Sequence, residues 1–213
     1  MRRPELIRSA AIAAVLLAAS FAADRLAYEY LVLDGVYEED WGRMLRVMGF
    51  APFWIVAAAA LALHDWPMRT AGSVRPALRR AGLLVAGVAA AGVTGELLKL
   101  VFRRERPRAH DGEYFFRAFS DRPLHNGGLA LPSTHAIVAF GAAAVLSRLF
   151  PRARFVFWGL AIGCGLTRVL TQAHFISDIT VAALVAWAVV AGIWARFGPR
   201  QDRAASARGR LAE

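Results

Sequence analysis

The sequence predicts an all-α integral membrane protein, folded as a bundle of six transmembrane helices. Two observations support this prediction. Hydrophobic residues make up 57% of the 213 residues and the mean hydropathy is +0.42, which is too apolar for an ordinary soluble domain of this size. The apolar residues also gather into six runs. One of them, 81–102, would form a helix of roughly 33 Å from about 22 residues, enough to cross the hydrocarbon core.

The first two runs lie on either side of an acidic segment. A short basic head precedes the first run at 9–23, which we interpret as an uncleaved helix. A signal peptide, with Arg2-Arg3 as a faint twin-arginine motif, is the alternative. Residues 24–46 are acidic and aromatic, and we expect a loop or a surface helix at the membrane interface there. The second run spans 47–63.

The remaining four runs follow basic or polar connections. They span 81–102, 129–150, 155–170 and 176–197. A long polar segment, 103–128, separates the first two of these, and long ordered loops of this kind often form lids or entrances to sites. We therefore assign residues 1–198 to one membrane domain and residues 199–213 to a disordered basic tail on the cytoplasmic side.

The distribution of charge predicts the topology and limits the partners. The formal net charge is +10, but the sequence contains no basic helix interleaved with aromatic residues and no zinc or helix-turn-helix pattern. We therefore expect contacts with lipid head groups and no nucleic-acid partner. Basic residues gather on one side of the six runs, which predicts a multi-pass protein of the cytoplasmic membrane with both termini in the cytoplasm. The exceptions on the other side would be explained by a local role such as holding phosphate: Arg103, Arg104, Arg106 and Arg108.

Three short polar blocks interrupt the apolar runs on the predicted non-cytoplasmic side. In chain order they are 99–107, 132–135 and 167–178, and together they supply cations, two imidazoles and a carboxylate. Ionisable side chains on membrane-spanning segments are costly to bury and usually face one another or a wet cavity. We therefore expect the three blocks to converge on one pocket that binds and cleaves a phosphate group.

The first block contains Lys99, the only lysine of the chain, and Arg106 seven residues later. We expect both on one face of a helix that continues until Pro107 ends it. Glu96, one turn before Lys99, is expected to be its structural ion-pair partner. Taken alone, either cation would be interpreted as an interface residue that reaches toward the lipid head groups.

The second block starts an apolar helix. Pro132 suits the first turn, so the N–H groups of Ser133, Thr134 and His135 are expected to point outward without acceptors. Such a helix start binds anions, and His135 would stand beside a bound phosphate, placed to protonate a departing oxygen. A helix cap with an interface histidine is the alternative interpretation.

The third block contains a histidine with a carboxylate placed to orient its ring. His174 and Asp178 are four residues apart, so on a helix they share one face, where the carboxylate can hold one ring nitrogen and leave the other basic. Arg168 can approach the same place with a planar fork suited to phosphate. A purely structural His–Asp pair is the alternative. The other histidines lack such neighbours and are expected on the surface or in loops: His64, His110 and His125.

In order, the blocks read Lys-x6-Arg-Pro, Pro-Ser-x-His and Arg-x5-His-x3-Asp. This order resembles the type 2 phosphatidic acid phosphatase and vanadium haloperoxidase superfamily, over residues 99–178 and in the six-span layout. Two positions depart from the family pattern. Thr134 stands where glycine is usual, and Thr167 stands where serine is usual. A β-branched residue at 134 disfavours the close backbone approach to phosphate that glycine allows, although its hydroxyl can compensate as a donor.

The resemblance implies a set of phosphate ligands. Lys99, Arg106 and Arg168 would bind the phosphate oxygens, and Ser133 and Thr134 with nearby N–H groups would complete the cradle. Phosphoryl transfer needs in-line placement and neutralised oxygens, which three cations supply without a metal.

The resemblance also implies the catalytic groups. His174 would attack phosphorus to form a phosphohistidine, Asp178 would orient it, and His135 would be the general acid. Neither a metal nor another cofactor is expected.

The implied function is a membrane phosphatase that hydrolyses a phosphomonoester or a pyrophosphate of a lipid at the periplasmic or outer face. Candidate substrates are undecaprenyl pyrophosphate, phosphatidylglycerol phosphate, phosphatidic acid and the lipid A phosphates, and the remaining partners are membrane lipids. The sequence does not distinguish among these lipids, nor a monomer from an oligomer. A non-hydrolytic lipid-phosphate binder or transporter is the alternative, although binding alone needs no nucleophile. Vanadate-dependent haloperoxidases share the constellation, but those relatives are soluble.

Overall fold

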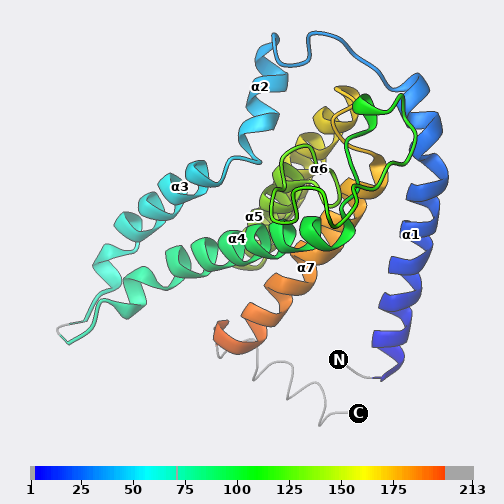
Figure 1. Cartoon of the computed structure of the whole chain (residues 1–213). Coiled ribbons are helices and arrows are strands. Elements are labelled where there is room, and N and C mark those ends of the chain that lie inside the picture. Colours follow the sequence, from blue (N-terminus) through cyan, green and yellow to red (C-terminus); the bar gives the residue numbers. More distant parts are fainter. Residues whose placement is uncertain (1–2, 71, 200–213) are drawn as a thin grey trace.

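Helices joined by turns and loops make up residues 3–70 and 72–199, the part of the chain described by a computed structural model (Figure 1). These residues contain no β-strand, so the all-α prediction is confirmed. Short 3-10 turns lie at Trp66–Met68, Pro107–Ala109 and Pro151–Ala153. In chain order the α-helices of the described residues are α1 (Arg3–Tyr30), α2 (Asp40–Val47), α3 (Ala51–His64), α4 (Arg75–Phe102), α5 (Thr134–Leu149), α6 (Arg154–Leu170) and α7 (Ile176–Phe197).

Four helical stretches of the described residues are long and apolar enough to cross a membrane, which supports an integral membrane protein. They are Ile7–Tyr30, Arg75–Phe102, Pro151–Leu170 and Ile176–Phe197. Helices α2 and α3 form a pair bent by 71° that would count as a fifth span, and α5 is apolar but only 16 residues long. The expected count of six spans therefore stays a prediction, as does the face on which the site lies.

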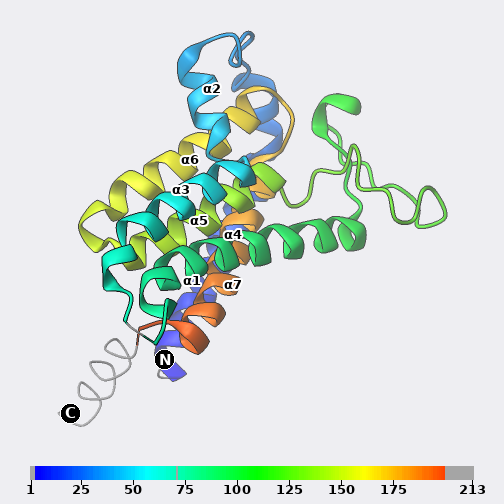
Figure 2. The ribbon, with the colours of Figure 1, turned by 90° about the vertical axis from the view of Figure 1, so that its left-hand side faces the viewer.

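Helix α5 lies at the centre of the bundle, in contact with α4, α6 and α7 (Figure 2). An unbroken stretch of this helix, 136–146, is buried and consists mostly of small apolar residues. A helix that is apolar all round is expected in a core. Small residues also allow close approach: a Cβ on Gly141 would lie 3.1 Å from the Cβ of Ala91 on α4. The short helix is thus held by protein on several sides.

The first helix is longer than we predicted. The sequence indicated an apolar run that ended at residue 23, but α1 continues through Asp24 and Arg25 to Tyr30. Its continuation is explained by partners elsewhere in the fold, because the carboxylate of Asp24 is buried against Ser177 and Tyr114. The expected interface segment is therefore shorter and contains a loop followed by α2.

Helix α4 ends earlier than we predicted. Arg103 adopts the left-handed conformation, with φ of 55°, and its N–H donates to the carbonyl of Lys99. The chain then turns away, so Arg106 lies in the extended connection rather than on the helix face that carries Lys99. The expectation that both cations share one helix face was wrong. The C-terminal ends of α4 and α6 and the starts of α5 and α7 lie at one end of the bundle, beside the end of α1 (Figures 1 and 2).

Helix α7 stops at Phe197, and the division into a membrane domain at 1–198 and a tail stays a prediction. The predicted tail, 199–213, lies outside the described residues from position 200 onward.

Candidate active site

The three polar blocks meet at this end of the bundle. Lys99 is in the last turn of α4, and Arg168 is in the last turn of α6. Ser133 is the N-cap of α5, whose first residues are Thr134 and His135. His174 lies in the connection before α7, and Asp178 lies in the first turn of that helix, so the expectation that the two share one helix face was wrong.

His174 and Asp178 form a buried pair. Nδ1 of His174 lies 3.4 Å from Oδ2 of Asp178, close enough for an ion pair but without the alignment of a hydrogen bond. The Asp178 side chain is fully buried, and its Oδ2 also accepts a hydrogen bond of 2.8 Å from the N–H of Phe175. The backbone N–H of His174 donates to the carbonyl of Arg168 at 3.2 Å. The imidazole is thus tied to both α6 and α7.

Burial sets the charge of the His174 ring. It lowers the pKa of His174 to about 4, because the protonated ring would lose its hydration, and the charges of Arg168 and Arg106 act in the same direction. The Asp178 carboxylate opposes this shift of the pKa. At neutral pH His174 is therefore uncharged, the state that a nucleophilic nitrogen requires.

Arg106 and Arg168 each leave a buried donor unused. Nε of both guanidinium groups is buried and has no hydrogen-bond partner among the described residues. Nη1 of Arg168 donates to the hydroxyl of Tyr37 at 2.7 Å, and the backbone N–H of Arg106 donates to the carbonyl of Gly128 at 3.1 Å. Burial and the nearby charge of Arg168 lower the pKa of Arg106, so two like charges are held close together. An anion bound between the two arginines would accept hydrogen bonds from the unpartnered donors and would offset the repulsion between the two positive charges.

Ser133 corrects part of the prediction for the start of α5. Its N–H does not point outward; it donates to the main-chain carbonyl of Asp178 at 3.3 Å. Pro132 lies before the N-cap and not in the first turn. The N–H groups of Thr134 and His135 are in the first turn, where no intrahelical acceptor exists and no side chain caps the helix. The Ser133 hydroxyl is buried and unpartnered in the described structure.

Thr134 joins the first block to the second. Its hydroxyl accepts a hydrogen bond from Nζ of Lys99 and donates to Oε1 of Glu96 at 2.5 Å. Lys99 also lies 3.2 Å from the same Glu96 oxygen, the pairing that we predicted. The other oxygen of Glu96 accepts from the Asn126 amide. The side chain that replaces the usual glycine therefore holds the lysine instead of pointing free into the cradle.

His135 lies close enough to Arg168, His174 and Lys99 for their charges to act on it. The corner between α2 and α3 packs tightly on its backbone, since a Cβ on Gly49 would come within 2.7 Å of His135 atoms. The structure thus brings both imidazoles close to cations of the first and third blocks.

Arg103 and Arg104 do not offer free charges, although the sequence suggested a phosphate-holding role for this basic cluster. The guanidinium of Arg103 donates its hydrogen bonds to main-chain carbonyls of 117–123 in the α4–α5 connection. Arg104 is buried against the carboxylate of Asp178 at 2.5 Å. His110 lies in the same connection as predicted, but it pairs with Glu105 at 2.8 Å.

Sequence reasoning missed two residues that touch the site from the N-terminal part of the chain. Tyr37 contacts Arg168, and Asp24 lies beneath the start of α7. A charged residue directly after the apolar run was the available signal for Asp24. No local pattern marked Tyr37.

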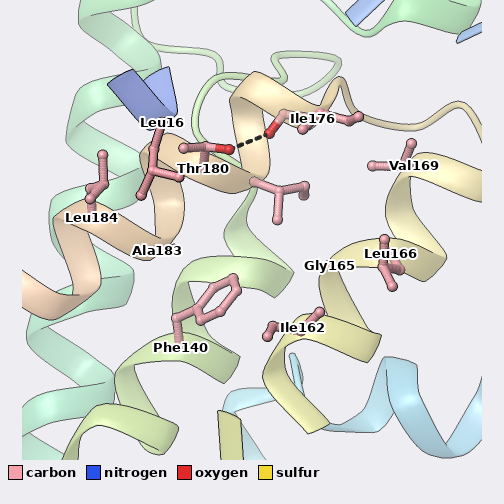
Figure 3. Close-up of a pocket in the computed structure, with 11 residues that line it drawn as sticks. Leu16, Phe140, Ile162, Gly165, Leu166, Val169, Ile176, Thr180, Ala183 and Leu184 are labelled. Atoms are coloured by element: carbon pink, nitrogen blue, oxygen red, sulfur yellow. Dashed lines mark hydrogen bonds between the residues drawn. The ribbon is translucent and has the colours of Figure 1, made fainter. Parts of the chain in front are cut away.

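Two apolar grooves flank this end of the bundle. One, of about 400 Å³, lies between α3, α4 and α5 and has Glu96, Asn126 and Thr134 among its lining residues. The other, of about 330 Å³, lies between α1, α5, α6 and α7 (Figure 3). Its only hydroxyl, on Thr180, already donates to the carbonyl of Ile176 at 3.1 Å (Figure 3). Only the first groove shares residues with the polar site.

Comparison with known proteins places these motifs in a family. Residues 80–202 match the PAP2 superfamily, which is more than half of the chain. The chain belongs to the PAP2 superfamily. The matched region contains all the predicted site residues of this PAP2 chain, whereas Asp24 and Tyr37 come from helices and loops that precede it.

Two curated relatives of this PAP2 protein are described as lipid A 1-phosphatase. The protein from Rhizobium johnstonii (strain DSM 114642 / LMG 32736 / 3841) is 37% identical over 112 residues, which cover 50% of this chain and 45% of the relative. The one from Rhizobium etli (strain ATCC 51251 / DSM 11541 / JCM 21823 / NBRC 15573 / CFN 42) is 36% identical over 112 residues, covering 50% and 47%. The chain thus spans about half the length of these relatives. No solved structure matches the PAP2 chain significantly.

Proposed function

We propose that this PAP2 chain is an integral membrane phosphatase that removes a phosphate group from a lipid through a phosphohistidine. The main support is the placement of unpartnered buried polar atoms. Among the described residues, six side-chain atoms are buried without a hydrogen-bond partner, and three of them belong to residues that were predicted to bind phosphate: Nε of Arg106, Nε of Arg168 and Oγ of Ser133. The others are Nε of Arg104, Oγ of Ser147 and Nδ1 of His174. Buried polar atoms without partners are costly, and phosphate oxygens are the acceptors that guanidinium and hydroxyl donors fit.

In the first step, the lone pair of His174 Nε2 attacks phosphorus while Nδ1 faces Asp178. The bond between phosphorus and the leaving oxygen breaks, and His135, which takes up a proton when the anionic substrate binds, donates that proton to the leaving oxygen. Lys99, Arg106 and Arg168 neutralise the equatorial phosphate oxygens as charge spreads over them. The products of this step are the dephosphorylated lipid and a phosphohistidine.

In the second step, His135 takes a proton from water, and the water oxygen attacks phosphorus. The P–N bond to His174 breaks, its electron pair returns to Nε2, and inorganic phosphate leaves. Asp178 keeps the ring in the same orientation for both steps.

The lipid nature of the substrate is supported by the membrane helices and by the groove beside Thr134. A head-group phosphate would occupy the polar site while an acyl chain lies along the apolar wall of that groove. Because both relatives are described as lipid A 1-phosphatase, we rank a lipid A-type sugar phosphate first. Undecaprenyl pyrophosphate, phosphatidylglycerol phosphate and phosphatidic acid are the competing substrates.

The distribution of basic residues supports a location in the cytoplasmic membrane with both termini inside. The active site then faces the periplasm or the exterior. Cysteine labelling at single introduced positions in intact cells tests this orientation.

Phosphate release from a panel of these lipids, measured with detergent-purified protein in EDTA, tests the function. We expect release by the wild type, strong loss in His174→Ala and His135→Ala, and normal release in His64→Ala, a histidine at the far end of α3. Wild-type-like release by both site variants would refute the mechanism. Label from a 32P substrate that stays on the protein in alkali and is lost in acid distinguishes a phosphohistidine enzyme from a non-hydrolytic binder.

A further inference from the structure

Arg104 is a charged side chain buried inside the bundle, next to the proposed site. Only 1% of its side chain is exposed. Nη2 donates to Oδ1 of Asp178 at 2.5 Å and to the Ser177 hydroxyl at 2.7 Å, and Nη1 lies 3.9 Å from Oδ2 of Asp24. Three aromatic rings surround the guanidinium at 5.0 to 5.5 Å: Phe21, Tyr114 and Phe175.

Asp24 holds the other side of this network. Its Oδ1 accepts the N–H of Ser177 at 2.8 Å, and its Oδ2 accepts the hydroxyl of Tyr114 at 2.7 Å and that of Ser177. The side chain is also 1% exposed. Buried ions are retained only when they are paired and hydrogen-bonded, and here a guanidinium lies between two carboxylates from different helices.

We propose that Arg104 and Asp24 are positioning residues that orient the His174 nucleophile through Asp178. This inference rests on the proposed function for its kinetic consequences. Arg104 occupies one oxygen of Asp178, so the other oxygen is turned toward His174 and the N–H of Phe175. Asp24 fixes the guanidinium and the first turn of α7 at the same time, because it binds both Arg104 and Ser177.

The orientation has a chemical consequence. A carboxylate held toward Nδ1 keeps the proton of the imidazole on that nitrogen and leaves the lone pair on Nε2 for attack. As the P–N bond forms, the ring becomes positively charged, and the same carboxylate lies beside it. Neither Arg104 nor Asp24 needs to touch the substrate for this effect.

Arg103 provides a matched control. It is adjacent in sequence and equally buried, yet its guanidinium contacts main-chain carbonyls of the connecting loop and no carboxylate of the site. Lysine at either position keeps the charge but loses the planar fork. Arg103→Lys therefore measures how much stability is lost when a buried arginine is replaced. Arg104→Lys has the same kind of loss and, in addition, loses the contact with Asp178.

The test compares Arg104→Lys, Asp24→Asn and Arg103→Lys in the full-length detergent-purified protein. We expect kcat to fall by about ten- to a hundredfold in the first two variants, the range seen when an outer partner of an active-site group is removed, with KM nearly unchanged. Arg103→Lys should lower the thermal midpoint without this loss of kcat. In an Asp178→Asn background, Arg104→Lys should lower kcat little further, because the carboxylate through which Arg104 acts on His174 is already absent.

Imidazole 15N NMR of the substrate-free protein supplies a readout that needs no turnover. In Arg104→Lys we expect the His174 ring to change from the Nδ1–H form to a mixture of tautomers, whereas in Arg103→Lys it should not. The proposal is overturned if folded Arg104→Lys has the wild-type His174 spectrum, or if its kcat falls no more than that of Arg103→Lys. Absence of phosphatase activity in the wild type would instead refute the proposed function, and the spectra would still test the positioning.

Discussion

The hydroxyl of Tyr37 accepts a 2.7 Å hydrogen bond from Nη1 of Arg168, and the guanidinium carbon lies 5.7 Å from the centre of the same ring. The contact joins the loop before α2 to the last turn of α6. It holds one edge of the guanidinium on protein and leaves Nε without a protein partner. The tyrosine thereby sets the direction in which Arg168 presents its fork.

Tyr37→Phe is expected to raise KM and to leave kcat nearly unchanged. The phenyl ring still packs on Arg168, but the hydroxyl that accepts from Arg168 and lies 3.4 Å from Thr167 is lost, which corresponds to about a two- to tenfold weaker substrate affinity. Steady-state kinetics with a water-soluble phosphate ester measure this effect. Tyr30→Phe, at an exposed position, is the control and should match the wild type. An unchanged KM in Tyr37→Phe would contradict the prediction.

Substitutions at Thr134 test what the threonine contributes at a position where the family usually has glycine. Thr134→Val keeps the shape but removes the hydroxyl between Lys99 and Glu96, and we expect kcat/KM to fall by about tenfold for the loss of a hydrogen bond to a charged group. Thr134→Ser keeps the hydroxyl and should retain most of the activity. A loss of activity in Thr134→Ser with normal activity in Thr134→Val would mean that the β-branched methyl, not the hydroxyl, is what the site requires.

The charge of His174 gives a prediction for pH. Its pKa of about 4 lies below the ordinary 6.5, so between these values the unfolded chain binds a proton that the folded site does not. This group therefore stabilises the fold above about pH 6.5, and its contribution decreases as the pH falls toward 4. Imidazole NMR in detergent should show His174, assigned with His174→Gln, still neutral at pH 5. A midpoint near 6.5 would contradict the burial of the ring.

A substitution at Gly92 tests whether an acyl chain of the substrate lies in the groove between α3, α4 and α5. A Cβ there would lie 3.7 Å from Val138, an ordinary contact, so a larger side chain can extend into the groove. We expect Gly92→Leu to raise KM for a long-chain lipid phosphate by about tenfold, without affecting a soluble ester.

Two controls define the Gly92 result. Gly159→Leu adds the same side chain on α6 where nothing lies near, and Ala183→Leu fills the groove of Figure 3 instead. Both should bind the long-chain lipid normally. A larger effect of Ala183→Leu than of Gly92→Leu would assign the acyl chain to the other groove.

The helical fold was predictable because its signals are local, whereas the meeting of the three blocks was expected from the cost of burying ionisable side chains and from the family resemblance. Apolar runs mark the helices, and the four-residue spacing of His174 and Asp178 predicted their pairing, although His174 lies just before α7 and not on it. The pairing of Lys99 with Glu96 follows from one helical turn.

The missed residues depend on partners far away in the chain. Asp24 meets Ser177 across 153 positions, and Tyr37 meets Arg168 across 131, so no periodic pattern connects them. The neighbours Arg103 and Arg104 are identical in sequence, yet their contacts diverge because Arg103 ends the helix in a left-handed conformation. The prediction that placed Arg106 on the same helix face as Lys99 was wrong for the same reason, because α4 ends before it reaches Arg106.

The place of Asp24 in α1 gives the first helix a part in building the catalytic end, beyond anchoring the chain in the bilayer. Exchange of this helix for a generic membrane anchor, a common step in designing expression vectors, would leave an arginine in the interior with half of its counter-charge removed. Affinity tags are therefore better placed at the opposite terminus.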